Sequence, residues 1–328
     1  MQEEKTIHIE ALLHPHIQKR LQATHILCGM MVLIALFSAG CGSTGGVSAI
    51  TTMTTEKATP PTTPITIGAK ATSTPLPTAT PLPQEPGWSL VWNDEFNGPS
   101  GTPPDASKWT PRTGGDGWGN KQVDYDTNNK NAYQDGQGHL VLEADRSDAT
   151  GYTCWYGPCK YTSAQITTSD HFSFTYGRIE GRIKIPAGEG FWSAFWLLGN
   201  NCEKVGWPTC GEVDIMEILG SKPDLLYGTA HGPGDFSDTY KIPQGTFAND
   251  YHTYALQWDP DHLLFSVDGI TYYTLNRSEI GKANWVYDHP YAILLNLPIG
   301  GVWPGNPPST APFPMKMLVD YVRVYTNS

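Results

Sequence analysis

Short strand-forming segments recur along residues 88–328, and no stretch of 12 or more residues there keeps a helical period. In GRIEGRIKIP (177–186), isoleucines alternate with arginine, glutamate and lysine, which is the period-two pattern of a half-buried strand. Asp268-Gly269, between two β-rich halves, is typical of a hairpin turn. Many short strands without helices between them indicate an all-β sandwich or barrel of antiparallel strands, formed as one domain.

The composition excludes two classes of protein. The chain has 21 Lys and Arg against 32 Asp and Glu, a formal net charge of -11, whereas a nucleic-acid-binding protein needs a basic face to displace counterions from phosphates. Of its 37 Phe, Trp and Tyr residues, 36 lie in 88–328, too many for a disordered segment. The chemistry is therefore expected in residues 88–328, with no nucleic-acid partner.

The first part of the chain has the pattern of an export signal. Residues 26–39 form an apolar run of 14 residues after Lys19 and Arg20, which is short for a spanning helix and typical of a signal peptide within residues 1–42. The small residues before Cys41 resemble a bacterial lipobox, although Ser38 stands where a branched aliphatic residue is usual. We expect a secreted or cell-surface protein, and membrane attachment through a lipidated Cys41 stays open beside plain secretion.

A spacer is predicted between the signal and the folded domain. Residues 43–87 contain 13 Thr and 8 Pro and no aromatic residue. Such a segment cannot bury enough apolar surface to offset the entropy of ordering it. We expect a disordered Thr/Pro-rich linker here, followed by the catalytic domain at 88–328.

The string GEVDIMEILG (211–220) is the most informative for chemistry. On a strand, Glu212 and Asp214 project to one side, and Glu217 joins them only if one extra residue near Ile215 or Met216 forms a β-bulge. The Cα atoms of the outer two acids would then be roughly 13 Å apart at ~3.3 Å per ladder step. On a concave sheet their carboxyl groups can converge to the ~5–5.5 Å of a retaining glycosidase.

Three carboxylates this close cannot all ionise comfortably, so one should keep its proton near neutral pH. That arrangement supplies an ionised nucleophile and a protonated general acid. A divalent-metal site and a solvated strand face remain as alternatives, although the surrounding Val, Ile, Met and Leu residues make a poor solvent face.

The string also resembles the active-site strand of glycoside hydrolase family 16, in its laminarinase-type branch. Further segments resemble that family in the same order: VWNDEFNG (91–98), YGRIEGRIKIP (176–186), GFWSAFWLLG (190–199) and VDYVRVY (319–325). The resemblance implies a jelly-roll β-sandwich of two antiparallel sheets with a concave substrate cleft, and catalysis that retains anomeric configuration.

By position, the resemblance makes Glu212 the nucleophile and Glu217 the acid/base, with Asp214 between them. It implies an endo-acting hydrolase of β-1,3-glucan or mixed β-1,3/1,4-glucan. Hydrolysis of galactan or xyloglucan, transglycosylation, and a non-hydrolytic glucan-binding module remain as alternatives, the last disfavoured because all three acids are present.

Aromatic and polar residues are expected to bind the sugar chain, because a pyranose ring packs its C–H face on an indole. Trp192 and Trp196 share a strand face, while Trp118 and Trp303 lie beside glycines at the expected cleft edge. The resemblance adds three polar positions: His231, as a partner of Asp214 or a sugar hydroxyl, Asn120 and Arg178. Where relatives often have Asn-Glu, this chain has Lys121 and Gln122, which puts the contacts of that region in doubt.

The resemblance implies no cofactor for catalysis but a structural calcium away from the cleft. Asp320 resembles its aspartate ligand, and Glu95 and the carbonyl of Gly138 would complete the oxygen set. A hydrogen-bonded structural Asp320 is the alternative.

The remaining cysteines form two local pairs, Cys154 with Cys159 and Cys202 with Cys210. In an exported domain we expect both pairs to be disulfides. The second would stiffen the approach to Glu212. We expect the protein to be a monomer.

Overall fold

A computed structural model describes residues 86–327 of the chain. The predicted signal peptide, the lipidation of Cys41 and nearly all of the predicted linker lie outside the described residues. No helix between residues 86 and 327 has the length and apolar character needed to cross a membrane.

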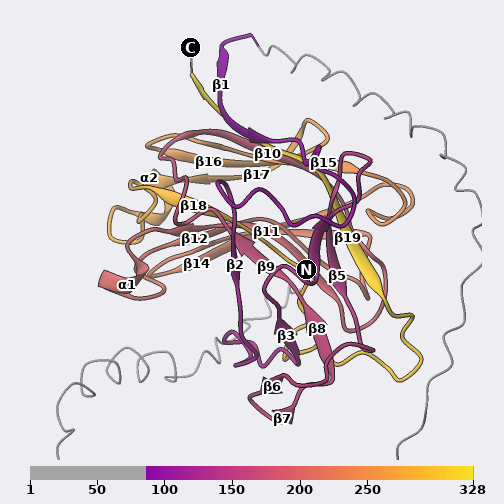
Figure 1. Ribbon diagram of the computed structural model, residues 1–328. Helices are drawn as coiled ribbons and strands as arrows, with labels where there is room; N and C mark the ends of the chain where they lie inside the picture. The colour runs from indigo at the N-terminus through magenta and orange to yellow at the C-terminus, as the bar shows by residue number, and fades with distance from the viewer. Residues whose placement is uncertain (1–85, 328) are drawn as a thin grey trace, which may run out of the picture. The chain divides into compact units, whose positions relative to one another are not determined.

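Two large antiparallel sheets pack against each other (Figure 1). Sheet A contains, in spatial order, β17 (Ile270–Asn276), β16 (His262–Val267), β15 (His252–Trp258), β10 (Gly177–Lys184), β19 (Met315–Asn327), β5 (Leu140–Ala144) and β4 (Ala132–Gln134), with β1 (Trp88–Asp94) also paired to β19. Sheet B contains β14 (Asp235–Lys241), β13 (Leu225–His231), β12 (Glu212–Leu219), β11 (Trp192–Gly199), β18 (Tyr291–Asn296), β9 (Gln165–Thr167) and β2 (Thr110–Arg112). The prediction of an all-β jelly-roll sandwich is confirmed.

The smaller elements lie at the ends and edges of the sheets. They are the parallel pair β3 (Asp124–Asp126) and β8 (Tyr161–Ser163), the hairpin of β6 (Thr153–Cys154) and β7 (Gly157–Pro158), and the short helices α1 (Cys202–Val205) and α2 (Arg277–Ile280). Both expected disulfides are present. One closes the β6–β7 hairpin, and the other closes the loop that contains α1.

The core fills the space between the two sheets, as the alternation in β10 predicts. Ile179 and Ile183 are fully buried in the core cluster, and burying each such side chain contributes roughly 1.5–3 kcal/mol. Gly181 lies between them, where an added Cβ would come within 2.9 Å of the Phe195 ring of β11. The glycine therefore lets the two sheets approach closely at this point.

The strand β12 contains the predicted bulge. Against β11, Phe195 pairs with Met216 while Trp196 pairs with Asp214, so Ile215 is the extra residue. The pairing with β13 shifts at the same place, between Asp214 and Glu217. The bulge reverses the alternation of the strand beyond it, which places Glu217 on the face that Asp214 occupies.

Candidate active site

Three carboxylates of β12 share the outer face of sheet B. Val213 and Ile218 point from the same strand into the core, whereas Glu212, Asp214 and Glu217 point away from it. Asp214 and Glu217 are only 3% and 8% exposed. The acids thus lie in a poorly solvated row. Burial and neighbouring negative charge raise the pKa of a carboxyl group.

His231 of β13 lies directly opposite Glu212 in the strand register. Its Nε2 forms an ion pair with Oδ2 of Asp214 at 3.2 Å, and its Nδ1 lies 2.8 Å from Oδ1 of Asp235. Burial favours the neutral ring, but the two aspartates outweigh it and raise the pKa of His231 to about 11. The predicted pairing of His231 with Asp214 is confirmed.

The contacts of His231 bear on the alternative of a metal site. Ligand atoms of Glu212, Asp214 and His231 lie within 4.8 Å of one another. Both ring nitrogens of His231 already lie against carboxylate oxygens, Nε2 at 3.2 Å from Asp214 and Nδ1 at 2.8 Å from Asp235. In this arrangement the ring belongs to a carboxylate network and leaves no nitrogen for a metal.

Burial raises the pKa of both glutamates. For Glu212, burial and the charge of Asp214 raise the pKa to about 8, while His231, the Trp207 indole and Arg112 act in the opposite direction. For Glu217, burial and the charge of Asp214 raise the pKa well above its usual value, while His231 and the Trp192 indole act in the opposite direction. Glu212 is partly exposed whereas Glu217 is only 8% exposed, so solvent favours ionisation of Glu212 more than of Glu217.

Trp207 is a member of the site that the sequence analysis missed. Its indole Nε1 donates a hydrogen bond to Oε2 of Glu212 at 3.1 Å, and its ring lies 5.9 Å from that of His231. Trp207 belongs to the loop closed by Cys202 and Cys210. The signal was present in the sequence, since closing this short loop before Glu212 turns the intervening residues back toward the acid.

Arg112 is the second missed residue, and no local signal marks it. It lies on β2, at the opposite edge of sheet B from β14, and its charge lowers the pKa of Glu212. Its guanidinium stacks on the ring of Trp118 at 4.8 Å. Arg112 therefore contacts the predicted Trp118 and also acts on the charge of Glu212 in β12. Its position depends on the pairing of β2 in sheet B, which the sequence alone does not give.

The predicted tryptophans gather around the carboxylates. Trp196 pairs with Asp214 across the strands, and its Nε1 donates to Oδ1 of Asn296 at 2.9 Å. Trp192 lies on the same strand face and meets Trp303 edge to face at 5.1 Å. Trp303 is 39% exposed, so it offers the outermost aromatic surface of this group.

Asn120 joins the loop that follows β2 to the loop that carries Trp303. Its Oδ1 accepts a hydrogen bond from the backbone N–H of Trp303 at 3.3 Å, and its carbonyl accepts one from Val302 at 2.8 Å. Among the described residues, its Nδ2 is buried without a hydrogen-bond partner. Asn120 thus positions Trp303. Lys121, next to it, is exposed and Gln122 is buried.

The prediction that Arg178 belongs to this site is wrong. Arg178 is on β10, in the middle of sheet A, and it alternates with the core residue Ile179. Its side chain therefore points to the outer face of the other sheet, where it pairs with Glu180 at 2.9 Å and lines a hollow of about 240 Å³. The alternation predicted its exposure correctly but could not say which sheet would contain the strand.

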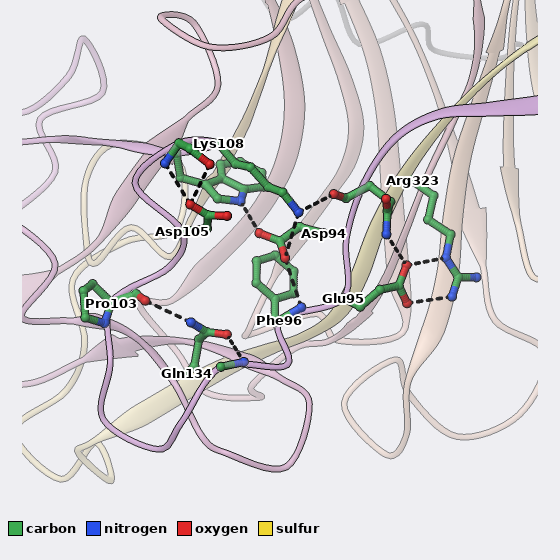
Figure 2. A network of polar contacts seen from close by, with 12 residues as sticks. Asp94, Glu95, Phe96, Pro103, Asp105, Lys108, Gln134 and Arg323 are labelled. Atoms are coloured by element: carbon green, nitrogen blue, oxygen red, sulfur yellow. Dashed lines mark hydrogen bonds and ion pairs between the residues drawn. The ribbon is translucent and has the colours of Figure 1, made fainter. Parts of the chain in front are cut away.

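The residues expected to hold calcium are already engaged. Both carboxylate oxygens of Glu95 accept hydrogen bonds from Arg323, at 2.9 and 2.8 Å (Figure 2). Asp320 pairs with Arg182, and its side chain is 32% exposed. Gly138 lies in the turn before β5 with a φ of 93°. With a guanidinium on each carboxylate, these side chains do not fit a calcium site as they are arranged, and no step is derived from one.

Asp320 does not share the core face of β19 with Val322 and Val324, as regular alternation along the strand would require. Arg182 pairs with Tyr321 while Ile183 pairs with Val319, so Asp320 is an extra residue in β19. Val319 and Val322 both face the core on either side of this irregularity. The alternation assumed for the strand fails at this position.

A β-sandwich with a poorly solvated row of carboxylates whose two glutamates have raised pKa values, and with tryptophans around them, is typical of a glycoside hydrolase. The family model for glycosyl hydrolases family 16 matches residues 119–323. The beta-glucanase of Rhodothermus marinus is 37% identical, over 73% of this chain and 86% of its own length. Glucan endo-1,3-beta-glucosidase A1 of Niallia circulans is 36% identical, over 73% of this chain and 38% of its own length.

A solved structure agrees with these sequence matches. The catalytic domain of an endo-1,3-beta-glucanase (laminarinase) from Thermotoga petrophila superposes with a TM-score of 0.68 at 41% identity, covering 74% of this chain and 98% of that one. The chain belongs to glycoside hydrolase family 16.

Proposed function

We propose that this protein is a retaining endo-hydrolase of β-1,3-glucan that also accepts mixed β-1,3/1,4-glucan. The observation that carries the proposal is the bulge at Ile215, which places Glu212 and Glu217 on one face of β12 with Asp214 between them. The similar proteins include a beta-glucanase, a glucan endo-1,3-beta-glucosidase and an endo-1,3-beta-glucanase, which supports this substrate class.

The first chemical step needs the two glutamates in different protonation states. Glu212, the more readily ionised, attacks the anomeric carbon, and Glu217 gives its proton to the departing glycosidic oxygen. The Trp207 indole and the imidazolium of His231 stabilise the Glu212 carboxylate. The bond to the leaving sugar breaks as the glycosyl–Glu212 ester forms.

In the second step the roles of Glu217 reverse. Having lost its proton, Glu217 takes one from a water molecule that attacks the same anomeric carbon, and Glu212 leaves as a carboxylate. Two displacements on one carbon restore the original configuration. Asp214 keeps its ion pair with His231 throughout and holds a negative charge beside both glutamates, which favours the protonated form of Glu217.

The tryptophans and Asn120 supply the binding surface. Trp192, Trp196 and Trp303 present indole faces on the same side of sheet B as the acids, where the C–H face of a glucose ring can pack. Asn120 holds Trp303 in place by accepting a hydrogen bond from the Trp303 backbone N–H. A neutral polysaccharide suits this surface.

The test is product analysis by anomer-resolved NMR at early times, with laminarin, lichenan, agarose and xyloglucan as substrates. The wild-type protein should release short β-1,3-linked oligosaccharides of retained configuration, and Glu212→Gln should be at least about 1,000-fold slower. Binding without cleavage would make the protein a glucan-recognition module. Transfer of sugar to a second oligosaccharide in place of water would make it a transglycosylase.

We also propose that the enzyme is exported and acts as a monomer outside the cytoplasm. The apolar run at residues 26–39 and the two disulfides support export. Whether Cys41 carries lipid is tested by metabolic labelling with radioactive palmitate. Label on the wild-type chain but not on Cys41→Ala would establish attachment, and its absence from both would leave plain secretion.

A further inference from the structure

Trp155 lies at the turn of the β6–β7 hairpin and is 50% exposed. The Cys154–Cys159 disulfide closes the hairpin around it. An exposed apolar side chain by itself needs no explanation. What marks this one is how firmly the protein holds it in place.

Several contacts fix the indole against the β2–β3 loop, residues 113–123. Its Nε1 donates to the carbonyl of Gln122 at 2.7 Å, and its backbone N–H donates to the carbonyl of Gly115 at 2.7 Å. Tyr156 packs edge to face on the ring at 5.4 Å and donates its own hydroxyl to Val123. The polar edge of the indole is therefore satisfied within the protein, and what it offers to solvent is apolar ring surface.

The loop also lies close to the ring at Gly117. A Cβ at this position would lie 3.0 Å from the indole, and the φ of Gly117 is 86°. Glycine at 117 thus lets the loop lie directly against Trp155. A ring that is already immobile loses little side-chain entropy when a ligand packs on it.

The loop that holds Trp155 is also part of the active-site wall. It carries Trp118, on which Arg112 stacks, and Asn120, which holds Trp303. In Figure 1 the β6–β7 hairpin lies on the side of sheet B that faces away from sheet A, the side to which Glu212 points. One loop, residues 113–123, therefore contacts both Trp303 and Trp155.

We propose that Trp155 is a distal sugar-binding platform, on which a glucose ring of a long β-1,3-glucan chain packs several residues away from the bond being cleaved. The loop that holds Trp155 departs from β2, which is four strands away from β12, or roughly 19 Å at ~4.8 Å per strand. A glucan that extends from the carboxylates across sheet B toward β2 must contain several sugars. This inference rests on the proposed function, because it deepens the substrate preference of the same site.

The experiment compares Trp155→Ala with the wild-type enzyme on laminarin and on laminaritriose. The KM for laminarin should rise about 5- to 10-fold with kcat nearly unchanged, because a ring that binds remote sugars contributes equally to the ground and transition states. Both constants for laminaritriose should stay the same. Trp155→Phe, which keeps an aromatic face, should recover much of the polymer affinity.

Ile270→Ala is the matched control. Ile270 is 52% exposed on β17, in the other sheet, so its removal tests the loss of an exposed apolar side chain away from the site. Its KM for laminarin should equal that of the wild type. A laminarin KM unchanged in Trp155→Ala, or raised equally for both substrates, would overturn the platform.

Calorimetric binding separates this inference from the proposed function. Laminarin is titrated into Glu212→Gln and into Glu212→Gln with Trp155→Ala, neither of which needs to turn over substrate. A larger dissociation constant in the double variant supports a sugar-binding role for Trp155 even if the wild type cleaves nothing. Equal dissociation constants in the two variants refute that role. Cleavage by the wild type decides the proposed function alone.

Discussion

Replacing Trp207 with Phe should move the pH dependence of the enzyme. The indole Nε1 is a hydrogen-bond donor to the Glu212 carboxylate, and such a donor stabilises the ionised form and lowers the pKa. Phe keeps an aromatic ring against His231 but has no donor. The pKa of Glu212 should therefore rise, and the ionised nucleophile should appear only at higher pH.

The magnitude follows from the geometry of the bond. Hydrogen bonds to charged groups contribute about 1.5–3 kcal/mol, and the Nε1–Oε2 distance of 3.1 Å places this one at the weaker end. About 1.5 kcal/mol corresponds to about one pKa unit. On the acid side of the optimum, where activity is proportional to ionised Glu212, kcat/KM should fall about tenfold.

The assay is the profile of kcat/KM for laminarin between pH 4 and pH 9. The acid limb should move upward by about one unit in Trp207→Phe. Trp285→Phe is the control, because Trp285 is a buried core residue and should leave the limb in place. If Trp207→Phe folds and its acid limb coincides with that of the wild type, the reasoning is refuted. The indole would then not control the ionisation of Glu212.

Two further predictions concern stability. The raised pKa of Glu212, about 8 against 4.5, means that the folded state keeps a proton that the unfolded state releases, so stability falls as pH rises from 4.5 to 8. Glu212→Gln should be more stable than the wild type at pH 8 by roughly 2–4 kcal/mol but not at pH 4, and parallel urea midpoints at both pH values would contradict this. Replacing Cys202 and Cys210 with Ser should cost about 2–3 kcal/mol in thermal or urea unfolding. The Cys202→Ser and Cys210→Ser variant should also lose more kcat/KM than a variant with Ser at Cys154 and Cys159, because the Cys202–Cys210 loop contains the Trp207 indole that contacts Glu212. Equal losses of kcat/KM in the two variants would show that this loop has no special part in catalysis.

Features that depend on neighbouring residues in the chain could be predicted from the sequence. The parity of Glu217 required a bulge, and the bulge lies at Ile215, one of the two positions expected. The cysteine pairs are close in sequence, and both disulfides form. In each case the constraint comes from residues close together in the chain. A strand has a fixed side-chain period, and two cysteines a few residues apart are always near each other in space.

Features that depend on which strands meet could not be predicted in the same way. Arg178 shows this, because its exposure follows from alternation but its distance from Glu212 follows from the place of β10 in sheet A. Arg112 shows the converse, since it lies on the edge strand β2 of sheet B and its charge nevertheless lowers the pKa of Glu212. Strand order is set by packing over the whole core, and no short segment contains it.

The bulge at Ile215 determines both the geometry and the charge asymmetry of the carboxylate row. Without it, Glu217 would point toward the core, where a carboxyl group has no solvent and no sugar to meet. With it, Glu212 stays at the start of β12, within reach of Trp207 and opposite His231, both of which favour its ionisation. Glu217 lies beyond the bulge and is only 8% exposed, and burial together with the charge of Asp214 raises its pKa well above the usual value, so it keeps its proton. A single extra residue thus supplies the two different carboxyl groups that double displacement requires.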